Sequence, residues 1–195
     1  ERFQRAGLWQ DLPLPHTRAR RVGVMGLGVI GEDCARKLAG LGFQVLGWSR
    51  TPKQVDAVHC FHGPGQLERF LGESEIVLLA LPLTPETTGI LDARRLRLLP
   101  PGCYLVNIAR GNLIVEADLL QALDAGHVAG AFLDVTEHEP LPPGHRLWTH
   151  PKVRITPHIA GLTNPRTAIE PIAENILRLE SGRSLLDLVD PARGY

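Results

Sequence analysis

The sequence predicts an α/β fold built on a doubly wound parallel sheet. Short apolar runs of strand length alternate along the chain with segments whose apolar residues recur at helical spacing. The run at residues 75–81 is almost continuously apolar, as expected for a parallel strand covered on both faces. This alternation favours parallel strands joined by right-handed crossovers, with ligands bound beyond the carboxyl ends of the strands.

Each element follows from a local pattern. Residues 1–10 have the pattern of a helix end, and the prolines that follow make residues 11–16 an extended connector. Strands are expected at 21–25, 44–48, 57–61, 75–81, 104–108, 128–133 and 153–155. Helices are expected at 29–41, 65–71, 92–98, 116–125 and 165–181. The buried stripe of the last helix is expected to consist of Ile169, Ile172, Ile176 and Leu179.

The composition favours a folded domain and excludes several classes of partner. Apolar residues make up 44% of the 195 residues, and the 21 basic residues balance the 21 acidic ones. A surface built for nucleic acid or for an anionic membrane is therefore not expected. No apolar run approaches a membrane span and no signal-peptide pattern opens the chain, so we expect a cytoplasmic protein. The cysteines Cys34, Cys60 and Cys103 are too scattered for a disulfide framework, and no metal site is expected.

A glycine-rich turn joins the first expected strand to the first expected helix. Residues 26–31 fit the pattern G-x-G-x-x-G, which is weak evidence alone but has here the strand–helix context of dinucleotide binding. The first glycine would allow the tight turn, the second the approach of a pyrophosphate, and the third close helix–strand packing. Free N–H groups at the helix start would bind the phosphates. The expected cofactor-binding residues in this turn are Gly26, Gly28, Val29, Ile30 and Gly31.

The end of the second strand distinguishes NAD from NADP. An NAD site usually carries Asp or Glu about 20 residues after the glycine turn. Here the strand ends in Ser49, Arg50 and Thr51, with no carboxylate to repel a 2′-phosphate. The guanidinium of Arg50 can bind that phosphate, and the two hydroxyls can donate to it. We expect NADP(H) to be preferred and NAD(H) to be accepted as well.

Four further segments follow expected strands. Leu81, Pro82 and Thr87 come after the fourth strand and would line the adenosine side, with Thr87 in reach of a phosphate. Three strings after the later strands, at residues 107–111, 134–140 and 156–161, together supply an arginine, a carboxylate and a histidine. That set is what a protein needs to hold a 2-oxo acid and move a proton onto its carbonyl oxygen. Arg110 and His158 are the arginine and the histidine, and both Glu137 and Glu139 are candidates for the carboxylate.

These motifs together resemble the D-isomer-specific 2-hydroxyacid dehydrogenases over essentially the whole chain. Residues 48–51 and 189–195 are most similar to the NADPH-dependent glyoxylate/hydroxypyruvate reductases of that family. The resemblance implies that Arg110 binds the 2-oxo acid, that His158 is the acid/base, and that Glu139 rather than Glu137 orients and charges the histidine. It also implies a homodimer and a cofactor site that includes Ile108, Ala109, Arg110, Asp134, His158 and Gly161, with Asp134 bonded to the nicotinamide carboxamide.

The resemblance divides the chain into three parts. Residues 1–20 would be an inter-domain helix end and linker, 21–161 the dinucleotide-binding domain, and 162–195 a return segment of the substrate domain. In the family, most of the substrate domain precedes the cofactor domain, and that part is not in this sequence. We therefore expect NADPH binding but poor turnover from these residues alone.

Two other functions share parts of these patterns. Residues 24–28 would also suit a dehydrogenase of 3-hydroxy acids, but the lysine in a downstream glycine-rich helix that such enzymes use is not found. A dinucleotide-sensing or co-regulator module without turnover could have the same fold. The complete set of arginine, glutamate and histidine argues for the enzyme.

Overall fold

The expected parallel sheet is confirmed by the computed structural model, which describes residues 2–10 and 16–189. In this part of the chain seven strands pair in parallel, in the order β3-β2-β1-β4-β5-β6-β7. The strands are β1 (Arg21–Met25), β2 (Gln44–Ser49), β3 (Val58–His62), β4 (Ile76–Leu79), β5 (Cys103–Asn107), β6 (Val128–Leu133) and β7 (Val153–Ile155). The strand order reverses at β1, and ligands of such sheets bind in the crevice at that point.

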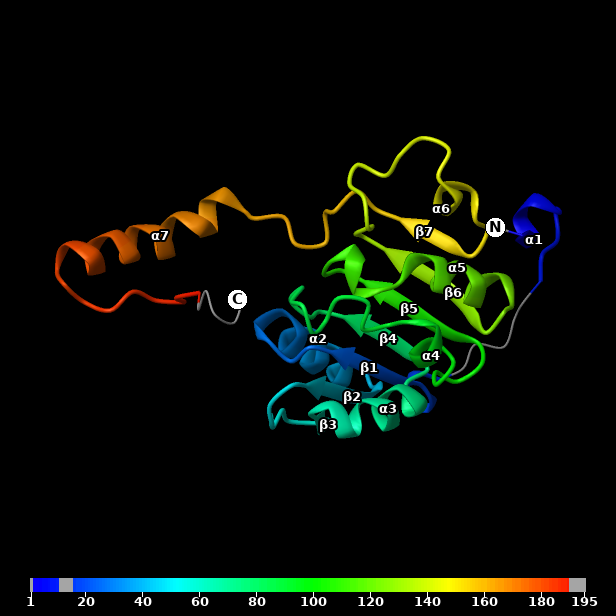
Figure 1. The fold of residues 1–195 in the computed structure, drawn as a ribbon, viewed down its shortest axis with the longest axis horizontal. Helices are drawn as coiled ribbons and strands as arrows, with labels where there is room; N and C mark the ends of the chain where they lie inside the picture. Colours follow the sequence, from blue (N-terminus) through cyan, green and yellow to red (C-terminus); the bar gives the residue numbers. More distant parts are fainter. Residues whose placement is uncertain (1, 11–15, 190–195) are drawn as a thin grey trace.

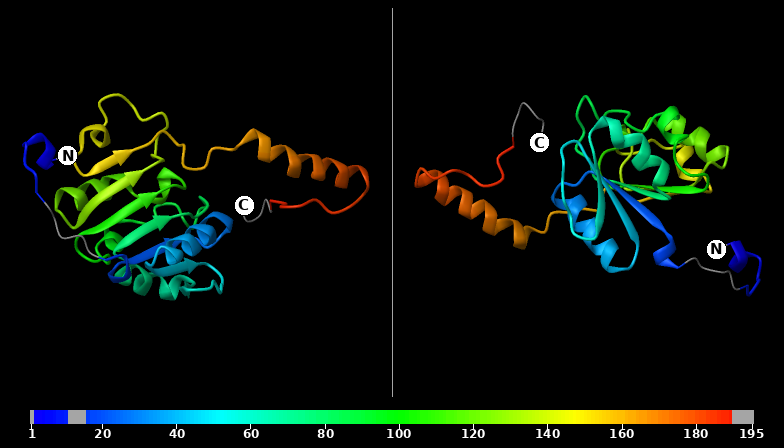
Figure 2. Two further views of the ribbon diagram at one scale, coloured as in Figure 1. Left: turned by 180° about the vertical axis from the view of Figure 1, so that it is seen from behind. Right: turned by 90° about the horizontal axis from the view of Figure 1, so that it is seen from below.

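Helices pack on both faces of the sheet (Figures 1 and 2). The helices are α1 (Arg2–Arg5), α2 (Val29–Gly40), α3 (Pro64–Glu73), α4 (Ala93–Leu96), α5 (Glu116–Asp124), α6 (Arg146–Thr149) and α7 (Pro165–Glu180), with short 3₁₀ turns η1 (Thr17–Ala19) and η2 (Gly111–Leu113). On one face α2 covers a small cluster around Val24, Leu27 and Ala35. On the other face α3, α4 and α5 enclose a larger core that includes Phe70, Leu96 and Leu123.

The differences from the expected elements are small within the sheet and larger at the two ends. The strand expected at 57–61 is present as β3, and β4 is shorter than the apolar run at 75–81. That run ends at Pro82, which has no N–H to continue a ladder. Of the described residues 2–10, Arg2–Arg5 form the helix α1, and residues 11–15 of the expected connector lie outside the described part of the chain.

The expected buried stripe on the last helix is wrong. Ile169, Ile172, Ile176 and Leu179 are between 54% and 70% exposed. Figure 1 shows the reason, since α7 extends away from the sheet instead of packing on it. Helical spacing predicts an apolar face, but it does not say which surface covers that face. Within the described residues, no helix is both long enough and apolar enough to cross a membrane.

The larger core predicts the stability cost of one substitution. Phe70 is fully buried in α3 and meets the ring of Phe61 edge-on at 6.0 Å between centroids. Phe70→Ala should lower the free energy of unfolding by about 3–5 kcal/mol, because it removes packing and leaves a cavity. Phe132→Ala is the matched control, because Phe132 is half exposed on β6, and it should cost less than about 1 kcal/mol. Urea unfolding measures both, and equal losses would contradict this account of the core.

Candidate functional site

The expected site residues lie after neighbouring strands at one edge of the sheet. Arg110 follows β5, Asp134 and Glu139 follow β6, and His158 follows β7. The glycine turn follows β1 at the same edge, because all the strands are parallel. The topology thus brings residues from distant parts of the sequence to one face of the molecule.

A buried carboxylate shapes the turn that carries the histidine. Asp134 is 6% exposed, and its carboxylate accepts hydrogen bonds from the hydroxyl of Thr156 and from the backbone N–H groups of Ile159 and Ala160. Burial opposes ionisation of Asp134, but these bonds and the nearby His158 outweigh it, so its pKa lies below the usual value. The bond from Asp134 to the nicotinamide carboxamide, which the family resemblance implies, stays a prediction, and within the chain Asp134 holds residues 156–160.

His158 has a backbone conformation that side chains rarely adopt. Its φ is 55°, in the left-handed region, and its N–H donates to the carbonyl oxygen of Asp134 at 2.8 Å. Such conformations persist where surrounding contacts hold them, and they are concentrated at functional sites. The Asp134 contacts supply that support on both sides of the residue.

The imidazole of His158 is paired with a carboxylate. Its Nδ1 lies 2.7 Å from Oε2 of Glu139, while the other carboxylate oxygen, Oε1, accepts the backbone N–H of Thr136 at 3.0 Å. Glu139, and not Glu137, therefore makes this contact. Burial works against the charge of Glu139, but the bonds from His158 and Thr136 and the charges of His158 and Arg110 hold its pKa below the usual value.

The turn that carries Arg110 is shaped by an asparagine and a glycine. The side chain of Asn107 donates to the carbonyl of Arg110 at 2.9 Å and accepts the N–H of Ala109 at 3.0 Å. Arg110 is exposed, and its guanidinium donates to the carbonyl of Ala109 at 2.7 Å. Next along the chain, the backbone of Gly111 packs so closely on residues 136–137 that a side chain there would overlap them. Neither Asn107 nor Gly111 was given a role by sequence reasoning.

The glycine turn has the geometry that its pattern predicts. Gly26 has a φ of 108°, and a Cβ on Gly31 would lie 1.7 Å from the carbonyl oxygen of Gly26. A Cβ on Gly28 would meet nothing within 4 Å, and Val29 and Ile30 are 91% and 62% exposed. The turn is therefore tightly packed on the sheet side and open on the solvent side. The open side leaves room for a phosphate at the start of α2.

The end of β2 presents a cation to solvent. Arg50 and Thr51 are exposed, while Ser49 is buried and its hydroxyl donates to the carbonyl of Thr51 at 2.8 Å. The indole N–H of Trp48 donates to the carbonyl of Gly63 at 2.9 Å and ties this end to the turn before α3. The hydroxyl of Ser49 is thus engaged within its own turn.

The loop after β4 holds its threonines in internal bonds. The hydroxyl of Thr87 donates to the carbonyl of Pro82 at 2.8 Å and accepts the N–H of Thr84 at 2.7 Å. Glu86 accepts the hydroxyl of Thr84 at 2.8 Å, which lowers the pKa of Glu86, and the charge of Arg50 adds to this effect. A carboxylate therefore lies within electrostatic reach of Arg50, a feature that the sequence near residue 50 does not reveal.

The remaining expected cofactor residues line the same edge. Leu81 and Ala109 are buried, Pro82 and Ile108 are partly exposed, and Gly161 is exposed with open space around its Cα. Among the described residues, no group of three or more His, Cys, Asp or Glu side chains is placed to hold a metal ion.

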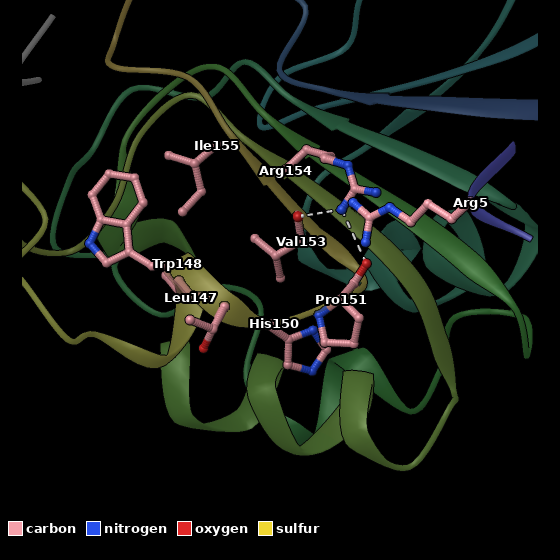
Figure 3. A pocket seen from close by; sticks show the side chains of 9 residues that line it. Arg5, Leu147, Trp148, His150, Pro151, Val153, Arg154 and Ile155 are labelled. Atoms are coloured by element: carbon pink, nitrogen blue, oxygen red, sulfur yellow. Dashed lines mark hydrogen bonds between the residues drawn. The ribbon is translucent and has the colours of Figure 1, made fainter. Parts of the chain in front are cut away.

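A separate hollow lies beside β7 and α6. It has a volume of about 800 Å³, and Trp148, Arg154 and Ile155 are among the residues that line it (Figure 3). Arg5 from α1 reaches its rim, and the indole N–H of Trp148 donates to the carbonyl of Pro142. Arg110, Glu139 and His158 are not part of this lining, so the hollow is distinct from the histidine site.

The parallel sheet with a glycine turn at its switch point defines a Rossmann-like dinucleotide-binding domain. The model of the D-isomer specific 2-hydroxyacid dehydrogenase NAD binding domain matches residues 1–160. The chain therefore belongs to the D-isomer specific 2-hydroxyacid dehydrogenase family.

Relatives with known structures share the whole fold of the chain. A D-isomer specific 2-hydroxyacid dehydrogenase from Xanthobacter autotrophicus, solved with NADPH and MES, is 51% identical, with a TM-score of 0.97 over 100% of this chain and 80% of that one. The NADPH-dependent glyoxylate/hydroxypyruvate reductase of Sinorhizobium meliloti, solved with NADP and sulfate, is 40% identical, with a TM-score of 0.96 over 100% of this chain and 63% of that one.

A curated relative is longer than this chain. The glyoxylate/hydroxypyruvate reductase A of Serratia proteamaculans is 48% identical over 188 residues, which are 96% of this chain and 60% of the relative. The chain thus spans about 60% of the length of the curated relatives that it matches.

The Asp134 contacts predict a pH-dependent contribution to stability. Its folded pKa is depressed, so the carboxylate stabilises the fold above its unfolded pKa, near 3.8, and this contribution is lost as the pH falls through the folded value. Asp134→Asn should cost about 1–3 kcal/mol at neutral pH, because an amide NH₂ then faces an N–H or hydroxyl donor. It should also flatten the loss of stability on acidification.

Urea unfolding at pH 7 and at a series of values from pH 4 down to pH 2, which spans the loss below 3.8, measures both effects. Asp56→Asn is the control, because Asp56 is exposed and should change stability by less than about 0.5 kcal/mol. A neutral-pH loss for Asp134→Asn no larger than that of the control would contradict the role of this carboxylate.

Proposed function

We propose that this chain is the cofactor-binding part of an NADPH-dependent reductase that converts a small 2-oxo acid, of the glyoxylate or hydroxypyruvate type, to the D-2-hydroxy acid. The observation that carries the proposal is the pair of His158 and Glu139, 2.7 Å apart and electrostatically coupled to Arg110. The NADPH and NADP in the similar solved structures support the choice of cofactor.

The residues of the site fit the proposed reaction. Arg110 would bind the carboxylate of the substrate through its planar fork and orient the neighbouring carbonyl. Glu139 accepts from Nδ1 of His158, so Nε2 is left to donate a proton to the carbonyl oxygen. When bound, NADPH supplies the hydride for the carbonyl carbon. Glu139 stabilises the charged imidazole before the proton leaves it.

The cofactor would lie along the edge from β2 to β7. Gly28, Val29 and Ile30 stand at the start of α2, where backbone N–H groups are suited to a pyrophosphate, and Gly26 and Gly31 shape their turn. The 2′-phosphate would bind Arg50 beside Ser49 and Thr51. Leu81, Pro82 and Thr87 would lie along the adenosine, and residues 108–110, Asp134, His158 and Gly161 along the nicotinamide end. Because the hydroxyls of Ser49 and Thr87 are engaged internally, their expected bonds to phosphate would require those turns to rearrange.

The proposal also covers the C-terminal residues 162–195, the oligomeric state and the cellular location. We assign residues 162–195 to the substrate domain, because the apolar stripe of α7 lies on no part of the described sheet. Residues 190–195 are outside the described part. The family resemblance supports a homodimer, and we include a cytoplasmic location in the proposal. Light scattering and cell fractionation test these two points.

Arg50→Ala tests the cofactor assignment. Losing a charge-assisted bond worth about 1.5–3 kcal/mol should weaken NADPH binding by roughly 10- to 100-fold, while NADH changes little. Fluorescence titration of both nucleotides against the 195-residue chain measures this. Arg97→Ala, at the exposed end of α4, is the control and should leave both affinities unchanged. An equal loss of affinity for NADPH and NADH would contradict the assignment of Arg50 to the 2′-phosphate site.

A turnover assay tests the assignment of the chain as one part of the enzyme. The side chains of His158 and Glu139 are 48% and 37% exposed, so water surrounds the reacting groups when these 195 residues stand alone. We expect NADPH to bind but glyoxylate and hydroxypyruvate to be reduced at least about 100-fold more slowly than by a protein extended to the length of the relatives. Comparable rates in the two proteins would contradict the proposal, and failure to bind NADPH would exclude it.

A further inference from the structure

Gly111 makes an unusually close contact with the segment that carries the glutamate. A Cβ built on Gly111 would lie 2.0 Å from the carbonyl carbon of Thr136, 2.1 Å from its oxygen and 2.4 Å from the nitrogen of Glu137. All three are backbone atoms, so no flexible side chain can move aside. The φ of Gly111 is not in the left-handed region, so space, and not conformation, is what the position requires.

The two sides of this contact are anchored unequally. On the Gly111 side, η2 is tied to the core through Leu113, which is fully buried and whose carbonyl accepts the N–H of Leu91 at 3.0 Å. On the other side Thr136 is buried but residues 137–139 are exposed, and the hydroxyl of Thr136 bonds to the carbonyl of His138 within the same short turn. A group inserted at Gly111 would therefore displace the Thr136–Glu137 peptide more than it displaces η2.

The displaced segment includes the N–H that holds Glu139. Thr136 donates its backbone N–H to Oε1 of Glu139 at 3.0 Å, and Oε2 of the same carboxylate lies 2.7 Å from Nδ1 of His158. A shift of residues 136–137 thus moves a support of the carboxylate that orients the histidine. Packing at Gly111, hydrogen bonding at Thr136 and the contact between Glu139 and His158 form one continuous chain of contacts.

We propose that Gly111 is a positioning residue for the Glu139–His158 pair, and that it acts through the peptide group between Thr136 and Glu137. The turn at residues 110–111, which presents the guanidinium of Arg110, also packs on this peptide group. The positions of Arg110 and of the Glu139–His158 pair therefore depend on the same contact. The inference rests on the proposed function, because that function says which reaction the pair serves. The coupling of Gly111 to Glu139 through residues 136–137 does not depend on which reaction that is.

Gly111→Ala in the 195-residue chain tests the coupling without turnover. Carbon-13 NMR of the Glu139 carboxyl should show its titration midpoint rising by roughly 0.5–1 pH unit, because the N–H that favours the charged form is withdrawn. Gly65→Ala is the matched control, because a Cβ there meets nothing within 4 Å, and it should leave the midpoint unchanged. An unchanged midpoint in Gly111→Ala, or an equal shift in both variants, would overturn the proposal.

A measurement on the unmodified chain keeps the test decisive if Gly111→Ala fails to fold. On titration from pH 7 to pH 3, the backbone amide signals of Thr136 and Gly111 should shift with the same midpoint as the carboxyl of Glu139. A Gly111 signal that does not follow that midpoint would overturn the coupling. NADPH titration of the same sample separates the two proposals, because failure to bind would refute the function and leave the Glu139 result standing.

Discussion

The buried carboxylate of Asp134 joins two neighbouring strand ends, and the placement of the histidine depends on it. Its oxygens accept three donors from residues 156–160, and its backbone carbonyl accepts the N–H of His158. Together with a bond from the His158 N–H to the carbonyl of Thr156 at 3.0 Å, these contacts hold the turn in which His158 has its positive φ. The contact between His158 and Glu139 depends on this placement of His158, because Glu139 lies in the segment after β6 and the imidazole must face that segment.

The parallel sheet divides its ligand edge between two tasks. The ends of β1 and β2 present the glycine turn and Arg50, and the ends of β5, β6 and β7 present Arg110, Glu139 and His158. The strand order places these groups on opposite sides of β4, at distinct positions along one edge. A long ligand with phosphate groups toward one end and a reacting ring at the other matches that layout.

The features that could be predicted from the sequence are those encoded locally. Periodicity gave the strands and most helices, and the glycine spacing gave a turn whose φ and packing agree with the pattern. The pairing of Glu139, instead of Glu137, with His158 followed from a family resemblance. The missed features are contacts between distant segments, such as Gly111 on residues 136–137, Glu86 near Arg50 and Asp134 on residues 156–160. The apolar stripe of α7 was recognised, but its burial depends on a surface that the pattern does not contain.

The projecting α7 has a consequence for how the isolated chain behaves in solution. The isoleucine and leucine side chains along α7 form an exposed apolar patch, and patches of this kind promote association between protein molecules. Self-association through that patch would obey mass action, so melting temperatures recorded at different protein concentrations would not be interchangeable. Thermal measurements on these 195 residues therefore call for dilute samples and a concentration series.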